Sequence, residues 1–299
     1  MSNQPVVSVV IIVFNGERFL AEAIRSVFAQ SCAAWELLLV DDGSSDGSTS
    51  IARHYADEYP ERVRYLEHPG HANQGMSASR NLGIRSARGT YIGFLDADDV
   101  WFAHTLQEQV AILEAHPDAA MVYGPIQWWY SWTEKPEDRA LDYVEKLGVP
   151  AETLIQPPRL LPRFLRNKAA VPSGMLVHRE VIDQLGGFDD RFRGEYEDQV
   201  FCTKICLNAP VFASGRCWYR YRQHPGSCVS TGQRNGATNA ARLRFLDWLA
   251  AYLEEQKVQE RSVRRALELE FWRFRHPVAF TWLRRGEQVV SQVRGFLAR

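Results

Sequence analysis

The chain has 299 residues, 45% of them hydrophobic, and its 35 basic side chains nearly balance 36 acidic ones. This composition is typical of a folded globular protein and argues against a disordered chain or a nucleic-acid-binding protein. The early apolar run, residues 6–14, is too short to cross a membrane and lacks the marks of a signal peptide, so we expect a cytoplasmic protein. Five cysteines without CxxC spacing argue against a disulfide framework and a zinc site.

Strand and helix patterns alternate through the first third of the chain. This alternation predicts an α/β fold with a mostly parallel sheet, in which ligands bind beyond the carboxyl ends of the strands. The predicted strands are residues 8–14, 35–40, 62–67 and 90–95, and the predicted helices are 17–30 and 77–87.

Polar residues follow three of these strands. Asn15 follows the first, Asp41 and Asp42 end the second, and residues 96–99 follow the fourth. Because these strand ends share one edge of the sheet, we expect the polar residues to converge on one cleft. No GxGxxG follows the first strand, so a dinucleotide-binding loop is not predicted.

Residues 96–99 place three carboxylates within four positions. Close carboxylates repel one another unless a cation lies between them, and Mg²⁺ or Mn²⁺ prefers such oxygens while keeping places for phosphates. Asp96 and Asp98 therefore indicate a metal–diphosphate site. Asp99 is better explained as the N-cap of a helix that the pattern predicts near Val100.

Several motifs, taken together and in order, resemble the inverting family 2 glycosyltransferases of the GT-A fold. They extend over residues 6–230, and the clearest departure is Ile12, where the family usually has a proline or another small or polar residue. The motifs lie at residues 8–15, 41–46, 75–83, 94–101, 186–189, 197–198 and 222–227.

The resemblance implies roles in binding the donor. Phe14 would stack on the nucleotide base, and Asp42 would recognise the base by hydrogen bonding. Asp41 and Asn15 would shape the pocket around the base. Asp96 would contact the ribose. For the metal, the resemblance implies Mn²⁺ or Mg²⁺ on Asp98, while Arg80 either lines the donor cleft or braces Asp96 or Asp98.

Inversion at the sugar needs a base that takes the proton of the acceptor hydroxyl. The resemblance implies Asp198, the second acid of a pair that begins a predicted helix. The alternative is an ordinary N-terminal helix acid favoured by the helix dipole. Glu195 and Glu197 are predicted to orient the acceptor.

Arg222 and His224 follow a predicted strand at residues 218–221. Arg222 could close over the diphosphate, because its planar fork pairs well with phosphate. His224 is either a metal or phosphate ligand or a structural residue, and the sequence leaves these alternatives open.

The middle of the chain is predicted to select the acceptor. Trp128 and Trp129 belong to an aromatic run, residues 127–132, whose rings either stack on sugar faces or form a core or interface cluster. Residues 133–168 are rich in proline and predict an insertion from the sheet.

We expect a catalytic domain at residues 1–236, with a nucleotide-binding half at 1–100 and an acceptor-binding half at 101–236. A helical extension at 237–299 is predicted from helical periodicity at 239–255 and 259–274. Its basic, aromatic end either lies on a membrane surface or packs on the catalytic domain or another subunit of a homo-oligomer.

The expected function is therefore inverting sugar transfer from a nucleoside diphosphate sugar to a hydroxyl of a glycan or lipid-linked acceptor, in bacterial surface polysaccharide assembly. Uridine is the expected base through the resemblance alone. The alternatives are a sugar nucleotidyltransferase, which would usually have a glycine-rich phosphate loop near its start, and a non-catalytic nucleotide- or sugar-binding protein.

Overall fold

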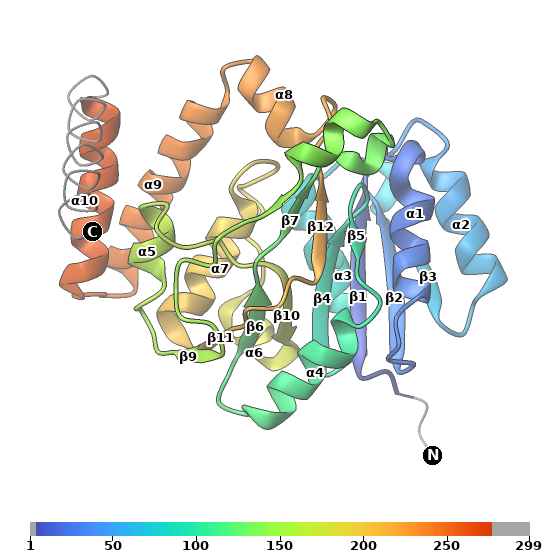
Figure 1. The fold of residues 1–299 in the computed structure, drawn as a ribbon, viewed down its shortest axis with the longest axis horizontal. Helices are drawn as coiled ribbons and strands as arrows, with labels where there is room; N and C mark the ends of the chain where they lie inside the picture. The colour runs from blue at the N-terminus through green and yellow to red at the C-terminus, as the bar shows by residue number, and fades with distance from the viewer. Residues whose placement is uncertain (1–3, 277–299) are drawn as a thin grey trace.

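The computed structural model describes residues 4–276, which form one large sheet, one small sheet and helices on both faces of the large sheet (Figure 1). The large sheet has the strand order β3-β2-β1-β4-β10-β6-β11-β9, and the small sheet has the order β5-β12-β7-β8. The strands are β1 Val7–Val13, β2 Trp35–Asp41, β3 Val63–Glu67, β4 Tyr91–Asp96, β5 Val100–Trp101, β6 Met121–Gly124, β7 Gln127–Trp129, β8 Tyr143–Val144, β9 Thr153–Ile155, β10 Ser173–His178, β11 Val211–Ala213 and β12 Tyr219–Arg222.

Ten α-helices accompany these strands in the described part of the chain, together with three short 3-10 turns. The helices are α1 Glu17–Phe28, α2 Ser48–Glu58, α3 Met76–Ser86, α4 Thr105–Ala115, α5 Leu161–Leu165, α6 Arg179–Leu185, α7 Glu197–Asn208, α8 Cys228–Arg234, α9 Thr238–Glu255 and α10 Arg261–Arg275. The turns are Pro69–His71, Ser131–Thr133 and Pro136–Leu141. None of the described helices is both long and apolar enough to cross a membrane.

Strands β1 to β4 are parallel, as the alternation predicts, and their register aligns the strand ends. Val13 pairs with Asp41, and Ile12 pairs with Asp96. Beyond β4 the sheet becomes mixed, because β10 runs antiparallel to both β4 and β6. The carboxyl ends of β1, β2 and β4 therefore meet at one edge, where the polar residues lie.

Alternate residues of the central strands enter two different apolar clusters. Val10 and Leu38 face the cluster under α3, α6 and α7, whereas Ile11 and Leu39 face the cluster under α1, α2 and α4. This alternation follows from the period of two in a strand. Burial on both faces explains why β2 is buried at every position.

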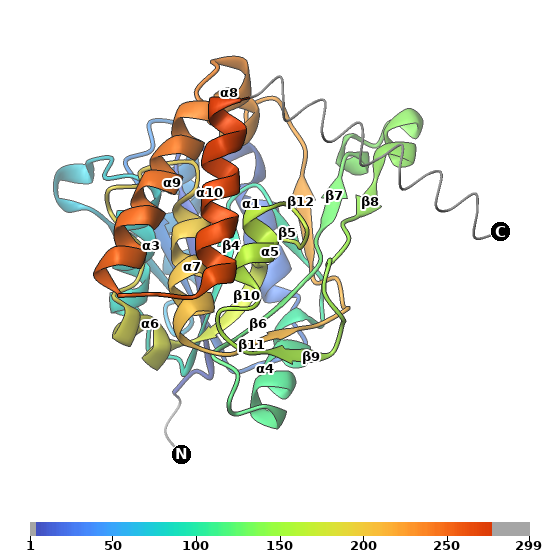
Figure 2. The same cartoon turned by 90° about the vertical axis from the view of Figure 1, so that its left-hand side faces the viewer.

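Helices α9 and α10 pack against the preceding part of the chain, beside α5 (Figure 2). Phe245 and Leu249 of α9 and Val263 of α10 are fully buried in the same cluster as Val10. Of the alternatives for this region, packing against residues 1–236 describes helices α9 and α10. The rest of the basic, aromatic end, from residue 277, lies outside the described residues.

All five cysteines are free thiols. Cys202 and Cys206 are buried in the core and act as small hydrophobic side chains.

Candidate active site

The polar residues that follow β1 and β2 do meet at one edge of the sheet. Phe14 is 56% exposed, and its ring is free to stack on a planar ligand. Asn15 has a left-handed backbone, with φ 52°, and its Oδ1 accepts the Ser45 N–H at 2.8 Å. The loop after β1 is therefore tied to the loop after β2.

Asp41 and Asp42 are buried, and their carboxylates shape the surrounding loops. Asp42 Oδ1 accepts hydrogen bonds from the Gln74 N–H at 2.7 Å and the Ser79 hydroxyl at 2.9 Å, and Oδ2 accepts the Gly75 N–H at 3.0 Å. Asp41 Oδ1 accepts the Ser44 N–H at 2.8 Å. Asp42 thus holds the start of α3, a role that the sequence did not predict, and base recognition by Asp42 stays a prediction.

Arg80 of α3 joins the strand edge to α7. Its guanidinium donates to Asp96 Oδ1 at 2.8 Å and to Glu197 Oε1 at 2.5 Å. Asp96 is 39% exposed, whereas the side chains of Arg80 and Glu197 are only 7% and 6% exposed. Of the two roles that the sequence allowed for Arg80, this geometry is that of a brace for Asp96.

Glu197 is buried beneath the surface of the candidate site. Burial raises its pKa to about 7, although the charge of Arg80 opposes this rise. This geometry argues against the prediction that Glu197 touches the acceptor, because its carboxylate is buried and paired.

Asp198 is the next residue and lies in the first turn of α7, as predicted. It is half-buried, and its Oδ1 accepts the Gln199 N–H at 2.7 Å. Burial raises the pKa of Asp198, while the Gln199 N–H and Arg80 lower it. A raised pKa favours proton uptake near neutral pH, which is what a general base requires.

Glu195 lies against α8. A Cβ on Gly232 of α8 would come within 1.7 Å of Glu195 Oε1, so the Glu195 carboxylate packs closely on this helix. Glu195 is partly exposed, and its predicted contact with the acceptor stays a prediction.

Asp98 and His224, far apart in the sequence, are brought together by the small sheet. His224 Nε2 lies 2.9 Å from Asp98 Oδ2, and both side chains are partly buried. Among the described residues no cluster of three or more metal-ligating side chains occurs. Two protein ligands nevertheless fit Mg²⁺ or Mn²⁺, which are commonly bound by one or two protein groups together with substrate phosphates and water.

The prediction that Asp99 caps a helix is wrong. Residues Val100–Trp101 form β5 against β12, and α4 begins only at Thr105. Asp99 is 1% exposed and accepts hydrogen bonds from the Tyr219 hydroxyl and, at 2.7 Å, from the Arg222 N–H. Burial, with Asp98 and Asp96 nearby, raises its pKa. Asp99 therefore fastens β12 to the end of the acidic run.

Arg222 supports Asp98 from behind. Its Nε donates to the Asp98 carbonyl at 2.6 Å, and its terminal nitrogen donates to Glu22 at 2.7 Å. Because Arg222 is only 2% exposed, this geometry argues against the predicted direct contact with a diphosphate. Glu22, its partner on α1, was not foreseen, since nothing in the sequence relates residues two hundred positions apart.

Trp132 and Phe19 hold the His224 loop, and neither was a predicted site residue. Trp132 Nε1 donates to the Gln223 carbonyl at 2.8 Å. The Phe19 ring lies 5.4 Å from the Trp132 ring and 4.9 Å from the His224 ring. No sequence signal separates Trp132 from the other aromatic residues of its run.

The two tryptophans predicted to bind acceptor lie on opposite faces of β7. The Arg222 guanidinium lies over the Trp129 ring, 4.4 Å from the ring centre. This contact matches the alternative in which the aromatic run forms a core or interface cluster. Trp128 stacks on Tyr143 at 5.7 Å and contacts Tyr221 at 5.1 Å. Contact of either ring with an acceptor stays a prediction.

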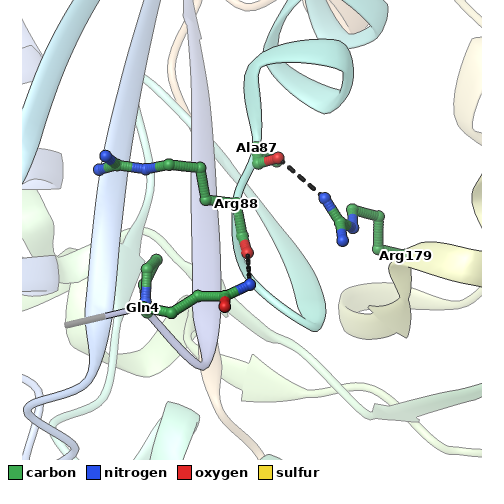
Figure 3. Close-up of a pocket in the computed structure, with 5 residues that line it drawn as sticks. Gln4, Ala87, Arg88 and Arg179 are labelled. Carbon is green, nitrogen blue, oxygen red and sulfur yellow. Dashed lines mark hydrogen bonds between the residues drawn. The ribbon is translucent and has the colours of Figure 1, made fainter. Parts of the chain in front are cut away.

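A surface pocket of about 310 Å³ lies at the opposite edge of the sheet, where β1 and β4 begin and β10 ends (Figure 3). Gln4 donates to the Arg88 carbonyl at 3.1 Å, and Arg179 donates to the Ala87 carbonyl at 3.1 Å. None of the predicted site residues lines this pocket. The acidic edge of the sheet is therefore the candidate active site.

Comparison with known proteins identifies the family of the chain. Residues 8–186 match the family described as Glycosyl transferase family 2. The chain is 42% identical over 116 residues to a putative glycosyltransferase, EpsE of Bacillus subtilis, covering 39% of this chain and 41% of that protein. It is 38% identical over 241 residues to an uncharacterized glycosyltransferase, alr2836 of Nostoc sp., covering 78% of this chain and 71% of that protein.

A third relative is TuaG of Bacillus subtilis, a putative teichuronic acid biosynthesis glycosyltransferase. It is 35% identical over 112 residues, or 37% of this chain and 42% of that protein. The chain thus spans less than half the length of EpsE and TuaG.

Among solved structures, the chain resembles the mannosyltransferase PcManGT from Pyrobaculum calidifontis in complex with GDP-Man and Mn²⁺. The TM-score is 0.57 at 19% identity, covering 89% of this chain and 69% of that one. This likeness concerns the fold, and it confirms the predicted GT-A α/β architecture.

Proposed function

Because the chain belongs to glycosyl transferase family 2, we propose that it is an inverting enzyme that transfers a sugar from a nucleoside diphosphate sugar to a hydroxyl group. One observation carries this proposal. Arg80 ties Asp96, at the strand edge where donors bind in such folds, to the start of α7, which carries Asp198. This link supports the proposal that a donor-side carboxylate and a base-side carboxylate serve one site.

In the proposed reaction the acceptor oxygen attacks the anomeric carbon from the face opposite the diphosphate. The bond from that carbon to the diphosphate oxygen breaks, and Asp198 takes the hydroxyl proton as the new bond forms. Arg80 and Glu197 hold the helix start that carries Asp198. Glu197 and Arg80 are thus proposed as positioning residues.

Asp98 and His224 are proposed to hold Mn²⁺ or Mg²⁺. When bound, the ion supplies positive charge that stabilises the leaving diphosphate. Arg222 and Asp99 position Asp98, since Arg222 binds the Asp98 carbonyl and Asp99 fixes the Arg222 backbone.

The donor pocket is proposed to use Phe14 as the stacking surface, with Asn15, Asp41 and Asp42 around the base. Uridine is the proposed base through the family resemblance. The PcManGT complex contains GDP-Man, so guanosine diphosphate sugars should be tested beside uridine diphosphate sugars as donors.

The acceptor is proposed to be a glycan or lipid-linked glycan of bacterial surface polysaccharide, with the chain acting at the cytoplasmic face of the membrane. The name of TuaG, a putative teichuronic acid glycosyltransferase, supports the polysaccharide part of this proposal.

The test measures donor binding and the slow hydrolysis of the donor, which is transfer of the sugar to water, across a panel of nucleotide sugars with Mn²⁺ or with EDTA. Asp98→Ala is expected to abolish metal-dependent donor binding. Asp198→Asn is expected to keep donor binding and to lose transfer by about 10² to 10⁴-fold, the usual contribution of a general base.

Arg179→Ala, in the pocket at the far edge of the sheet, is the matched control and should behave like the parent. Equal transfer by Asp198→Asn and the parent would remove Asp198 from the mechanism. Formation of a nucleotide sugar from a sugar phosphate and a nucleoside triphosphate would instead identify a nucleotidyltransferase.

A further inference from the structure

Three aromatic residues form a row across the small sheet. Tyr221 of β12 pairs in register with Trp128 of β7, and Trp128 pairs with Tyr143 of β8. Their rings touch in the same order, with Trp128 5.1 Å from Tyr221 and 5.7 Å from Tyr143, the latter nearly parallel at 6°. Register and contact together show that the three rings share one face of the sheet.

The row begins beside the acidic run. Tyr221 lies two residues after Tyr219, so both side chains are on the same face of β12, and the Tyr219 hydroxyl donates to Asp99. Burial, with Asp99, Asp96 and Asp98 nearby, raises the pKa of Tyr221. Trp129 and Arg222 are on the opposite face, where they contact each other.

The row ends in solvent. Tyr143 is 50% exposed, whereas Tyr221 and Trp128 are partly buried. Figure 2 shows β7 and β8 at one side of the molecule, far from α9 and α10. Two steps between neighbouring strands separate Tyr221 from Tyr143, a span of about 10 Å, which exceeds the width of one sugar ring.

We propose that this row, Tyr221, Trp128 and Tyr143, is a subsite for the sugars of an extended saccharide acceptor that precede the accepting unit. The proposal rests on the proposed function and narrows its acceptor to an oligosaccharide or longer glycan. Tyr143 lies on the edge strand β8, so the outer face of its ring is open to the apolar C–H face of a sugar. Trp128 stacks on the inner face of Tyr143 and contacts Tyr221 in turn, so these two rings support the stacking surface and offer only their edges to the saccharide.

The charge of the segment around Tyr143, residues 131–146, favours a saccharide over a membrane surface as the bound partner. Residues 131–146 carry five acidic and three basic side chains, which would repel an anionic lipid surface. The row is also continuous with the acidic edge at which the transferred sugar would be joined. A chain of sugars is the ligand that fits both the acidic charge of this segment and its continuity with the acidic edge.

The probe is a panel of immobilised bacterial surface oligosaccharides, each graded in length from monosaccharide to hexasaccharide. We expect retention of the parent protein to rise with length in at least one series. Tyr143→Ala should lose about tenfold in affinity for the long members, equivalent to about 1.4 kcal/mol, and none for the shortest. Tyr143→Phe, which keeps the ring, should retain most of the affinity.

Val144→Ala is the matched control, because Val144 is the next residue, is 51% exposed and points to the other face of β8. Absence of length-dependent retention by the parent, or equal losses in Tyr143→Ala and Val144→Ala, would overturn the proposal. Mn²⁺-dependent donor hydrolysis, measured on the same preparations, separates this failure from failure of the proposed function.

Discussion

Arg80 places one fixed positive charge between carboxylates from different parts of the chain. It binds Asp96 at the end of β4 and Glu197 at the start of α7. Glu197 is buried, so its charge has little water to stabilise it and depends on Arg80. The charge of Glu197 at the start of α7 is therefore balanced by the Arg80 guanidinium.

This dependence predicts a large loss of stability in Arg80→Ala. Without Arg80, Glu197 is left buried without its partner and must either keep an unpaired charge or take up a proton, so the free energy of unfolding should fall by about 3 kcal/mol. Urea unfolding followed by circular dichroism measures this loss.

The double variant Arg80→Ala with Glu197→Gln provides the control. Because the amide has no charge to leave unpaired, the double variant should recover at least about 1 kcal/mol relative to Arg80→Ala. A double variant as unstable as Arg80→Ala, or less stable, would show that the ion pair is not the cause.

The pH dependence of transfer is expected to report on Asp198, the proposed base. Only the deprotonated carboxylate accepts a proton, so activity is present above its pKa in the folded protein and is lost as pH falls through that value. Burial raises this pKa, so the loss should begin above the ordinary range of aspartate, about 3.9.

The measurement is kcat/KM for transfer against pH, with donor binding titrated over the same range. Constant kcat/KM down to about pH 4, with donor binding intact, would contradict a base with a raised pKa.

At the scale of elements, the small sheet assembles the candidate metal site. β12 pairs with β5, which follows Asp98 and Asp99, and it ends at Arg222, two residues before His224. β7 pairs with β12 on its other side and leads into the turn that carries Trp132. Trp132, Phe19 and the Gln223 carbonyl then fix the loop of His224.

Trp132→Ala should therefore weaken Mn²⁺ binding in the presence of a nucleoside diphosphate. Loss of a group that orients a metal ligand commonly costs about 10- to 100-fold in affinity, and a calorimetric titration measures it. Trp132→Phe, which keeps a ring against Phe19 but loses the N–H, should fall between Trp132→Ala and the parent. Unchanged Mn²⁺ affinity in Trp132→Ala would show that the loop holds His224 without this tryptophan.

At the scale of the whole molecule, the C-terminal helices complete the core. Arg242 of α9 pairs with Glu270 of α10 at 3.0 Å and also donates to the Leu165 carbonyl. Both charged side chains are buried between the helices, so each needs the other as a partner. We still propose residues 1–236 as the catalytic domain, but its apolar cluster is not closed without α9 and α10.

Phe245→Ala should therefore destabilise the entire chain, although it lies outside the proposed catalytic domain. Phe245 is fully buried, and removing such a ring costs about 3–5 kcal/mol. The control is Leu243→Ala on the same helix, which is 37% exposed and should cost no more than about 1 kcal/mol. Two separate thermal transitions in the parent, with only one affected by Phe245→Ala, would contradict a shared core.

The sequence by itself determined the α/β alternation, the parallel strands β1 to β4 and the polar edge beyond their carboxyl ends. These features depend on local periodicity and on chirality, which act within a few residues of the chain. The helical start at Asp198 and the helices α9 and α10 were predictable for the same reason.

Tertiary structure alone decided how the acidic residues are used. Asp99 looks like a helix cap in the sequence, yet pairing of β5 with β12 carries it into the interior to bind Tyr219 and Arg222. Asp198 and Glu197 are neighbours, but packing against Arg80 buries one and leaves the other half-exposed. Local sequence cannot specify such pairings, because burial and long-range contacts are set by chain segments more than one hundred residues apart.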